Sequence, residues 1–172
     1  MKKKLLSGLL LLAALFMITG CDNKPNNTNG NTNTEKKDTS SLKIGTVSVD
    51  LNRSGSFHDI SYKYPENAMA SNVGTFAIMD LMNGEDLVVR IAMYFFENKA
   101  IGEVNPGSGL SSVDAIEYNN NTWNVYEGIK DGKKVINYAT QEGNDSYTIT
   151  FISNDDAFEF SDAFMKTVEF NR

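Results

Sequence analysis

Residues 87–96 read LVVRIAMYFF, and this stretch decides how the rest of the sequence is interpreted. Apart from Arg90, it is apolar at both alternating sets of positions, and β-branched and aromatic side chains are frequent in it. That pattern is typical of a strand covered on both faces, so we expect residues 86–97 to form a strand at the core of a sheet. Asn83-Gly84 tolerates positive φ, which predicts a hairpin with residues 73–82.

Further strands are expected on either side of this hairpin. Residues 43–51 alternate apolar with polar side chains, and so do residues 58–64, which Pro65 ends. A second series of strands follows a loop at residues 105–109. Its members are residues 122–128, 133–141 and 146–153, with turns predicted at Asp131-Gly132 and at residues 143–145.

Two helices complete the prediction. Residues 111–118 are expected to form a short helix that Ser111 or Ser112 begins. A C-terminal helix is expected after Ser153-Asn154, with apolar side chains over an arc of about 160°. These apolar side chains are Ala157, Phe158, Phe160, Phe164, Met165 and Val168. The fold class predicted is α+β: an antiparallel β-sheet meander with a short middle helix and a C-terminal amphipathic helix packed on the sheet.

The amino terminus has the layout of an export signal. Lys2, Lys3 and Lys4 precede an apolar run at residues 5–17, which is shorter than the about 20 residues that a membrane span needs. Ile18-Thr19-Gly20-Cys21 resembles the bacterial lipobox. The resemblance implies cleavage before Cys21 and attachment of diacylglycerol to its thiol, which would bind the protein to the lipid bilayer. We therefore expect residues 1–20 to be a lipoprotein signal peptide.

A hydrophilic segment follows the predicted lipid attachment site. Residues 22–41 read DNKPNNTNGNTNTEKKDTSS, without an aliphatic or aromatic side chain. Such a segment cannot bury apolar surface, so residues 21–43 are predicted to be the lipidated Cys and a disordered tether with a reach of about 25 Å. Residues 44–172 are expected to form one domain. The predicted location is the extracytoplasmic face of the cell membrane.

The charge of the chain disfavours some partners. Residues 1–20 hold three of the 16 Lys and Arg side chains and none of the 22 acidic ones, so the remainder has 13 basic against 22 acidic groups. A net charge of −9 without a basic stripe predicts that nucleic acid is not a partner and that anionic headgroups are repelled.

Catalytic and metal chemistry find little support in the sequence. His58 is the single His and Cys21 the single Cys, so a zinc site is not expected, and His58 is expected within a strand as a surface or half-buried side chain. Asp155, Glu159 and Asp162 are expected on the solvated face of the last helix rather than in a Ca²⁺ loop. We predict no enzyme activity, no metal and no cofactor.

Three short motifs resemble a known fold. They are Ile60-Ser61-Tyr62-Lys63-Tyr64-Pro65, residues 121–128 around Trp123, and residues 147–151 before the last helix. Together they resemble the PsbP-like fold, which an extrinsic photosystem subunit, a nuclear import accessory factor and many small bacterial lipoproteins share. The resemblance covers about residues 57–172 and implies an accessory or docking module without catalysis. It carries over no functional residue.

Two functions are therefore kept open. The first is a non-catalytic interaction or accessory module of the cell envelope, with an envelope protein or component as partner. The second is a small-ligand carrier or hydrolase with a cavity between the sheet and the last helix. Most aromatic side chains are expected in the core, whereas Tyr118, Tyr126 and Tyr138 are predicted to show an edge to a ligand or partner.

Overall fold

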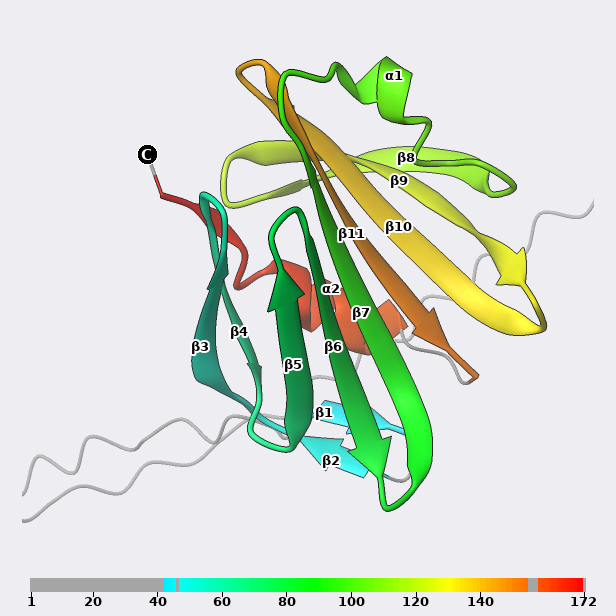
Figure 1. Ribbon diagram of the computed structural model, residues 1–172. Helices are drawn as coiled ribbons and strands as arrows, with labels where there is room; N and C mark the ends of the chain where they lie inside the picture. Colours follow the sequence, from blue (N-terminus) through cyan, green and yellow to red (C-terminus); the bar gives the residue numbers. More distant parts are fainter. Residues whose placement is uncertain (1–41, 46, 155–157, 172) are drawn as a thin grey trace, which may run out of the picture. The chain divides into compact units, whose positions relative to one another are not determined.

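The computed structural model describes residues 42–45, 47–154 and 158–171 of the chain (Figure 1). The predicted signal peptide, Cys21 and residues 22–41 of the predicted tether lie outside the described residues. The chain divides into two units, Met1–Lys37 and Asp38–Arg172, and all described residues belong to the second unit. None of the helices within that described part is long and apolar enough to cross a membrane.

Most of the second unit consists of β-strands. The elements in chain order are β1 Leu42–Ile44, β2 Val47–Val49, β3 Leu51–Phe57, β4 Ile60–Pro65, β5 Ala68–Val73, β6 Phe76–Asn83, β7 Asp86–Phe96, α1 Ile101–Val104, β8 Ser111–Tyr118, β9 Asn121–Lys130, β10 Lys133–Glu142, β11 Asp145–Ser153, α2 Phe158–Met165 and β12 Glu169–Phe170.

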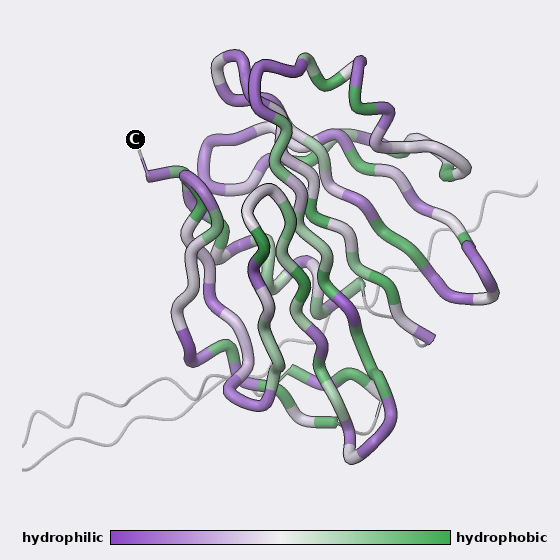
Figure 2. Tube along the Cα trace, in the orientation of Figure 1, coloured by the Kyte–Doolittle hydropathy of each residue, from purple (hydrophilic) through white to green (hydrophobic). Residues whose placement is uncertain are grey.

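Seven strands form one large antiparallel sheet in the order β5-β6-β7-β11-β10-β9-β8. Strands make up 66% of the structure and helices about 10%, so the predicted α+β class is wrong and the fold is mainly β. The strand at the centre of the order is β11, and β7 lies beside it. Figure 2 shows hydrophilic residues at the hairpin turns and hydrophobic residues along the strands between them.

The predicted middle helix is wrong, because residues 111–118 form strand β8. The expected helix rested on Ser111 or Ser112 as its start. In the structure, Val113 pairs with Val125 and Ile116 pairs with Trp123, so β8 advances three residues where β9 advances two. This β-bulge interrupts the alternation that would have identified a strand.

Helix α2 lies against one face of the seven-stranded sheet (Figure 1). Phe160 and Phe164 are buried, and both rings pack against Phe151 of β11, with centroids 6.2 Å and 5.4 Å away. Asp155 and Ala157, which were expected in this helix, lie outside the described residues. We call the face of the sheet that α2 covers the inner face and the opposite one the outer face.

A smaller sheet adds a second layer next to α2. It contains three strands in the order β12-β4-β3, and its residue Tyr62 packs on Phe164 with ring centroids 5.5 Å apart. Phe164 therefore contacts both sheets. Strand β1, which begins at Leu42, pairs with β2 and contacts α2.

Three segments of the amino-terminal half differ from the prediction. Residues 43–51 form parts of three strands rather than one, and residues 68–73 form β5, which was not predicted. The strand expected from His58 begins at Ile60, because His58 occupies the turn after β3 with φ 49°.

Candidate functional site

The three predicted contact tyrosines lie on two different faces of the large sheet. Tyr118 at the end of β8 and Tyr138 in β10 lie on the inner face, with ring centroids 6.0 Å apart. Both are buried. Tyr126 in β9 pairs with Asn137, so it lies on the outer face. The structure thus brings together two of the three side chains.

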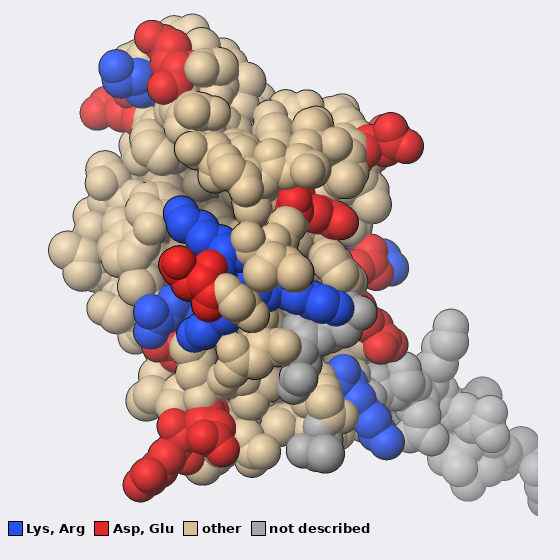
Figure 3. All heavy atoms as spheres, turned by 90° about the vertical axis from the view of Figure 1, so that its right-hand side faces the viewer, with Lys and Arg blue, Asp and Glu red and all other residues tan. Residues whose placement is uncertain are grey.

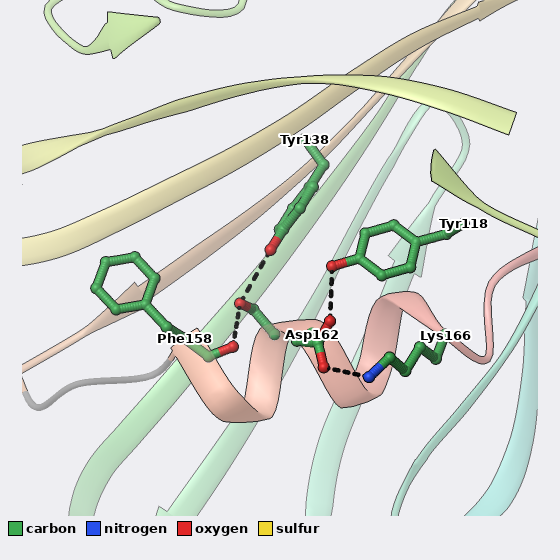
Figure 4. Close-up of polar contacts among 6 residues, drawn as sticks. Tyr118, Tyr138, Phe158, Asp162 and Lys166 are labelled. Atoms are coloured by element: carbon green, nitrogen blue, oxygen red, sulfur yellow. Dashed lines mark hydrogen bonds and ion pairs between the residues drawn. The ribbon is translucent and has the colours of Figure 1, made fainter. Parts of the chain in front are cut away.

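The hydroxyl groups of Tyr118 and Tyr138 bind consecutive residues of α2 (Figure 4). The Tyr118 hydroxyl donates to Oδ1 of Asp162 at 2.9 Å, and Lys166 Nζ donates to Oδ2 of the same carboxylate at 2.6 Å. Tyr138 Oη lies 3.2 Å from Ser161 Oγ. Because Ser161 Oγ donates its single proton to the Phe158 carbonyl at 2.9 Å, the Tyr138 hydroxyl is the donor in this pair.

The electrostatics of this cluster keep the phenols protonated. Burial raises the pKa of Tyr118 first, and the neighbouring Tyr138 and Asp162 raise it further. Burial is also the main cause that raises the pKa of Tyr138. Neither phenol can act as a base near neutral pH, and both donate hydrogen bonds to the helix. The cluster therefore fastens α2 to the sheet.

The space between the sheet and α2 is filled with apolar side chains. Phe151, Phe160, Phe164 and Met165 are each exposed by 1% or less. A hollow of about 10 Å³ lies near the start of the helix, beside Lys134 and Phe158. That volume is at or below the room that one water molecule needs.

A surface hollow of about 260 Å³ lies between β3, β4 and the end of α2. Two of the hydroxyl groups that line it have partners within the chain. Thr167 Oγ1 accepts from the Lys63 backbone at 2.9 Å and donates to the Phe164 carbonyl at 2.7 Å, and Ser61 Oγ donates to the Glu169 carbonyl at 3.4 Å. Thr167 and Ser61 therefore hold β4 to the segment that follows α2.

His58 connects two hairpin turns. Its ring stacks on Phe95 with centroids 3.9 Å apart, and Nε2 lies 2.9 Å from the Gly74 carbonyl oxygen. Because a carbonyl only accepts, Nε2 carries the proton in this contact. The side chain links the turn before β4 to the turn after β5. No group of three or more His, Cys, Asp or Glu side chains that could hold a metal ion occurs among the described residues.

The outer face carries an apolar cluster that the sequence did not indicate. We define the outer-face cluster as Met69, Val73, Phe76, Tyr94 and Phe96. Val73 pairs with Phe76 and Phe76 pairs with Tyr94 across β5, β6 and β7, so these side chains share one face. The Phe76 and Tyr94 rings are 4.8 Å apart, and those of Tyr94 and Phe96 are 6.2 Å apart.

Large parts of this cluster contact solvent. Val73 is 70% exposed, Met69 63% and Tyr94 39%. The alternation in residues 87–96 had suggested that both faces of β7 are covered, but an apolar pattern cannot distinguish a covered face from an exposed one. Beside the cluster, Arg90 of β7 forms an ion pair with Asp80 of β6 through two hydrogen bonds of 2.7 Å each.

Basic side chains gather on the side where the β9–β10 hairpin projects (Figure 3). The hairpin contributes Lys130, Lys133 and Lys134, with Asp131 in its turn. Figure 3 also shows acidic side chains among and around the basic ones. The charges of this side are therefore mixed, and the expectation that nucleic acid is not a partner stays a prediction.

Comparisons with known proteins find similarity among solved structures alone. No protein-family model matches the chain. No curated protein sequence matches it either. Among solved structures, the chain is similar to the solution structure of cyanobacterial PsbP (CyanoP) from Synechocystis sp. PCC 6803, with a TM-score of 0.46 and 8% sequence identity. The similarity covers 65% of this chain and 86% of that one.

The neighbour is a PsbP protein, the name that the three motifs also suggested, but at this TM-score and identity the match carries no argument about the chain. At this TM-score no residue, partner or activity of the cyanobacterial protein is transferred to the chain. The function is therefore inferred from the residues described above.

Proposed function

We propose that the chain is a membrane-anchored extracytoplasmic lipoprotein that acts as a non-catalytic interaction or accessory module of the cell envelope. The anchor in this proposal is diacylglyceryl-Cys21, which the lipobox resemblance of residues 18–21 supports. Two or three acyl chains are sufficient for stable membrane attachment.

The interaction role rests on the outer-face cluster. Soluble proteins bury most large apolar side chains, and contiguous exposed apolar patches mark interaction sites. The cluster combines Met69 and Val73 with three aromatic side chains. Aromatic residues and Met are enriched in protein interfaces. Tyr94 offers both an apolar ring and a hydroxyl, which suits a surface that is wet when free and covered when bound.

The non-catalytic part of the proposal is supported by how the polar side chains are used. Tyr118, Tyr138, Ser161 and Asp162 would be the most suitable group for chemistry, but they bind one another and the helix backbone. Within the described part of the chain, no buried side-chain nitrogen or oxygen lacks a hydrogen-bond partner. These groups serve the packing of α2.

The alternative, a ligand carrier or hydrolase with a cavity between sheet and helix, has weaker support. Phe151, Phe160 and Phe164 occupy the space that such a cavity would need, with ring centroids between 5.4 and 6.4 Å apart. A ligand could enter only if α2 moved away from the sheet and broke the contacts of Tyr118 and Tyr138.

Site-specific photo-crosslinking tests the proposal. A benzophenone amino acid replaces Tyr94 in the full chain, and irradiation is carried out in intact cells. The matched control carries it in place of Phe158, which is 37% exposed against 39% for Tyr94 but lies at the start of α2. We expect crosslinked products in the membrane fraction from position 94 that position 158 does not give. Equal products from both positions, or none from position 94, would contradict the proposed interaction surface.

A further inference from the structure

We infer that β5 is an open pairing edge through which two copies of the chain join as a two-fold symmetric dimer. The inference rests on the proposed function, because it names a partner for the outer-face cluster, of which Met69 and Val73 belong to β5. It depends on the unpaired backbone edge of β5 and on the absence of charged residues and proline from that strand.

Strand β5 is the last strand on one side of the large sheet. It pairs with β6 through all six of its residues, and no strand of the described residues follows it in the order. Five of the six residues, Met69 to Val73, are exposed. In an antiparallel ladder, alternate residues direct their N–H and C=O groups away from the paired neighbour, so about three residues of β5 present these groups to solvent.

Proteins usually protect such an edge with charged side chains, proline or a bulge. Residues 68–73 read AMASNV, which contains neither a charge nor a proline, and the pairing with β6 runs without a register shift. The edge is therefore unprotected.

The opposite edge of the same sheet is constructed differently. Strand β8 is also exposed along residues 111–117, but it carries Asp114 and Glu117 and has a bulge between Val113 and Ile116. The edge strand β3 of the small sheet has a register shift as well, between Leu51 and Arg53. The contrast between β5 and these two edges indicates that β5 is kept available for pairing.

A second copy of the chain fits this edge because the segment is complementary to itself. In antiparallel pairing about a two-fold axis through Ser71, Met69 of each copy lies opposite Val73 of the other copy. Ala70 lies opposite Asn72, and the two Ser71 side chains meet at the axis. The pairing buries no charged side chain. Met69 and Val73, which are 63% and 70% exposed in the single chain, cover each other across the junction.

This arrangement keeps the outer faces on the same side. A two-fold axis perpendicular to the sheet joins both sheets into one, and residues of equal parity share a face across the junction. Phe76, Tyr94 and Phe96 of both copies then extend the joined apolar surface. Net negative charge opposes association of the two copies, so salt should strengthen the dimer.

Disulfide trapping in membranes tests the dimer. Ser71→Cys and Ser112→Cys are made in the full chain, since both serines are exposed residues of edge strands, one on β5 and one on β8. After mild oxidation, we expect the Ser71→Cys chain to migrate at twice the monomer mass. The Ser112→Cys chain should give no more of this product than the unchanged chain. The unchanged chain shows how much disulfide forms through Cys21 alone.

Charge substitution tests the same contact without a covalent bond. Ser71→Lys places two ammonium groups opposite each other at the axis, whereas Ser112→Lys adds the same charge on β8. In sedimentation of the full chain in detergent, we expect Ser71→Lys to weaken dimerisation at least tenfold and Ser112→Lys to leave it unchanged. Circular dichroism shows whether both variants remain folded.

Three results would overturn the dimer: equal disulfide yields from positions 71 and 112, a crosslinked product whose mass is not twice that of the chain, or an unchanged chain that sediments as a monomer. If the dimer is refuted while position 94 still crosslinks a membrane component, the proposed function stands and only this inference falls.

Discussion

Truncation of Phe164 to alanine should destabilise the protein strongly. Phe164 is fully buried at 0% exposure, and its ring lies 5.4 Å from that of Phe151 and 5.5 Å from that of Tyr62. Removal of a buried Phe side chain costs about 3–5 kcal/mol, because transfer free energy is lost and a cavity remains. We expect about 4 kcal/mol here, since the side chain connects α2 with both sheets.

Urea unfolding followed by the fluorescence of Trp123 measures this loss. Trp123 is the single Trp and is 1% exposed, so unfolding changes its surroundings completely. With a slope of about 2 kcal/mol/M, a loss of 4 kcal/mol lowers the midpoint by about 2 M. The control is Phe158→Ala on the same helix, which should cost about 1 kcal/mol because that ring is 37% exposed.

This pair of variants distinguishes a filled core from a ligand cavity. If the region under α2 were a cavity that opens for a ligand, Phe164 would contribute little to the free energy of unfolding. A loss below about 1 kcal/mol for Phe164→Ala, or equal losses for both variants, would refute the packing argument.

Three further predictions concern the tyrosines and one tight loop. Tyr118→Phe should lower the free energy of unfolding by about 1 kcal/mol through the lost bond to Asp162, more than Tyr126→Phe does, as measured by urea titration. Gly107→Ala should cost about 1–3 kcal/mol in the same assay, because a Cβ there overlaps the Tyr126 ring. The third prediction concerns alkaline pH: buried phenols with raised pKa keep their protons when folded, so the contribution of these phenols to the free energy of unfolding is constant below about pH 10 and is lost as the pH rises above it. In absorbance titration at alkaline pH, tyrosinate should form later in the folded than in the unfolded chain, because burial raises the pKa of Tyr62, Tyr118, Tyr138 and Tyr147.

The strands with strong local signals could be read from the sequence. Asp131 and Gly132 both have positive φ, as the predicted turn requires. In the first hairpin Gly84 has positive φ, but Asn83 lies in β6 and pairs with Asp86. Strands β7 and β9 to β11 lie within a few residues of their predicted bounds. Turn chemistry and β-branched composition are local properties, so a single sequence is sufficient to indicate them.

Strands β5 and β8 were not predicted, and the physical reasons differ. Strand β8 was expected as a helix because Ser111 and Ser112 resemble a helix start, and its bulge between Val113 and Ile116 interrupts the alternation that indicates a strand. Strand β5 was missed because Ala68–Val73 contains only one β-branched residue, and its conformation depends on the pairing with β6. Mistaking β8 for a helix made the predicted class α+β instead of mainly β.

The candidate surfaces were less predictable than the fold. Tyr118 and Tyr138 were expected to contact a ligand, but their burial against α2 depends on contacts between residues far apart in sequence. The exposure of Tyr94 depends on which face of β7 is covered by α2. Because residues 87–96 are apolar on both faces, their sequence does not distinguish the covered face from the exposed one. Such properties arise from tertiary packing and have no local signal.

We propose that the domain works at a membrane surface to which Cys21 attaches it. The mass of the intact mature protein, isolated from the membrane fraction, tests whether Cys21 carries the lipid. We predict a chain that begins at Cys21 and carries a diacylglycerol group on that residue, and a Cys21→Ser variant that stays unprocessed and unlipidated. A mature chain that begins at another residue, or that starts at Cys21 without an acyl group, would contradict the account.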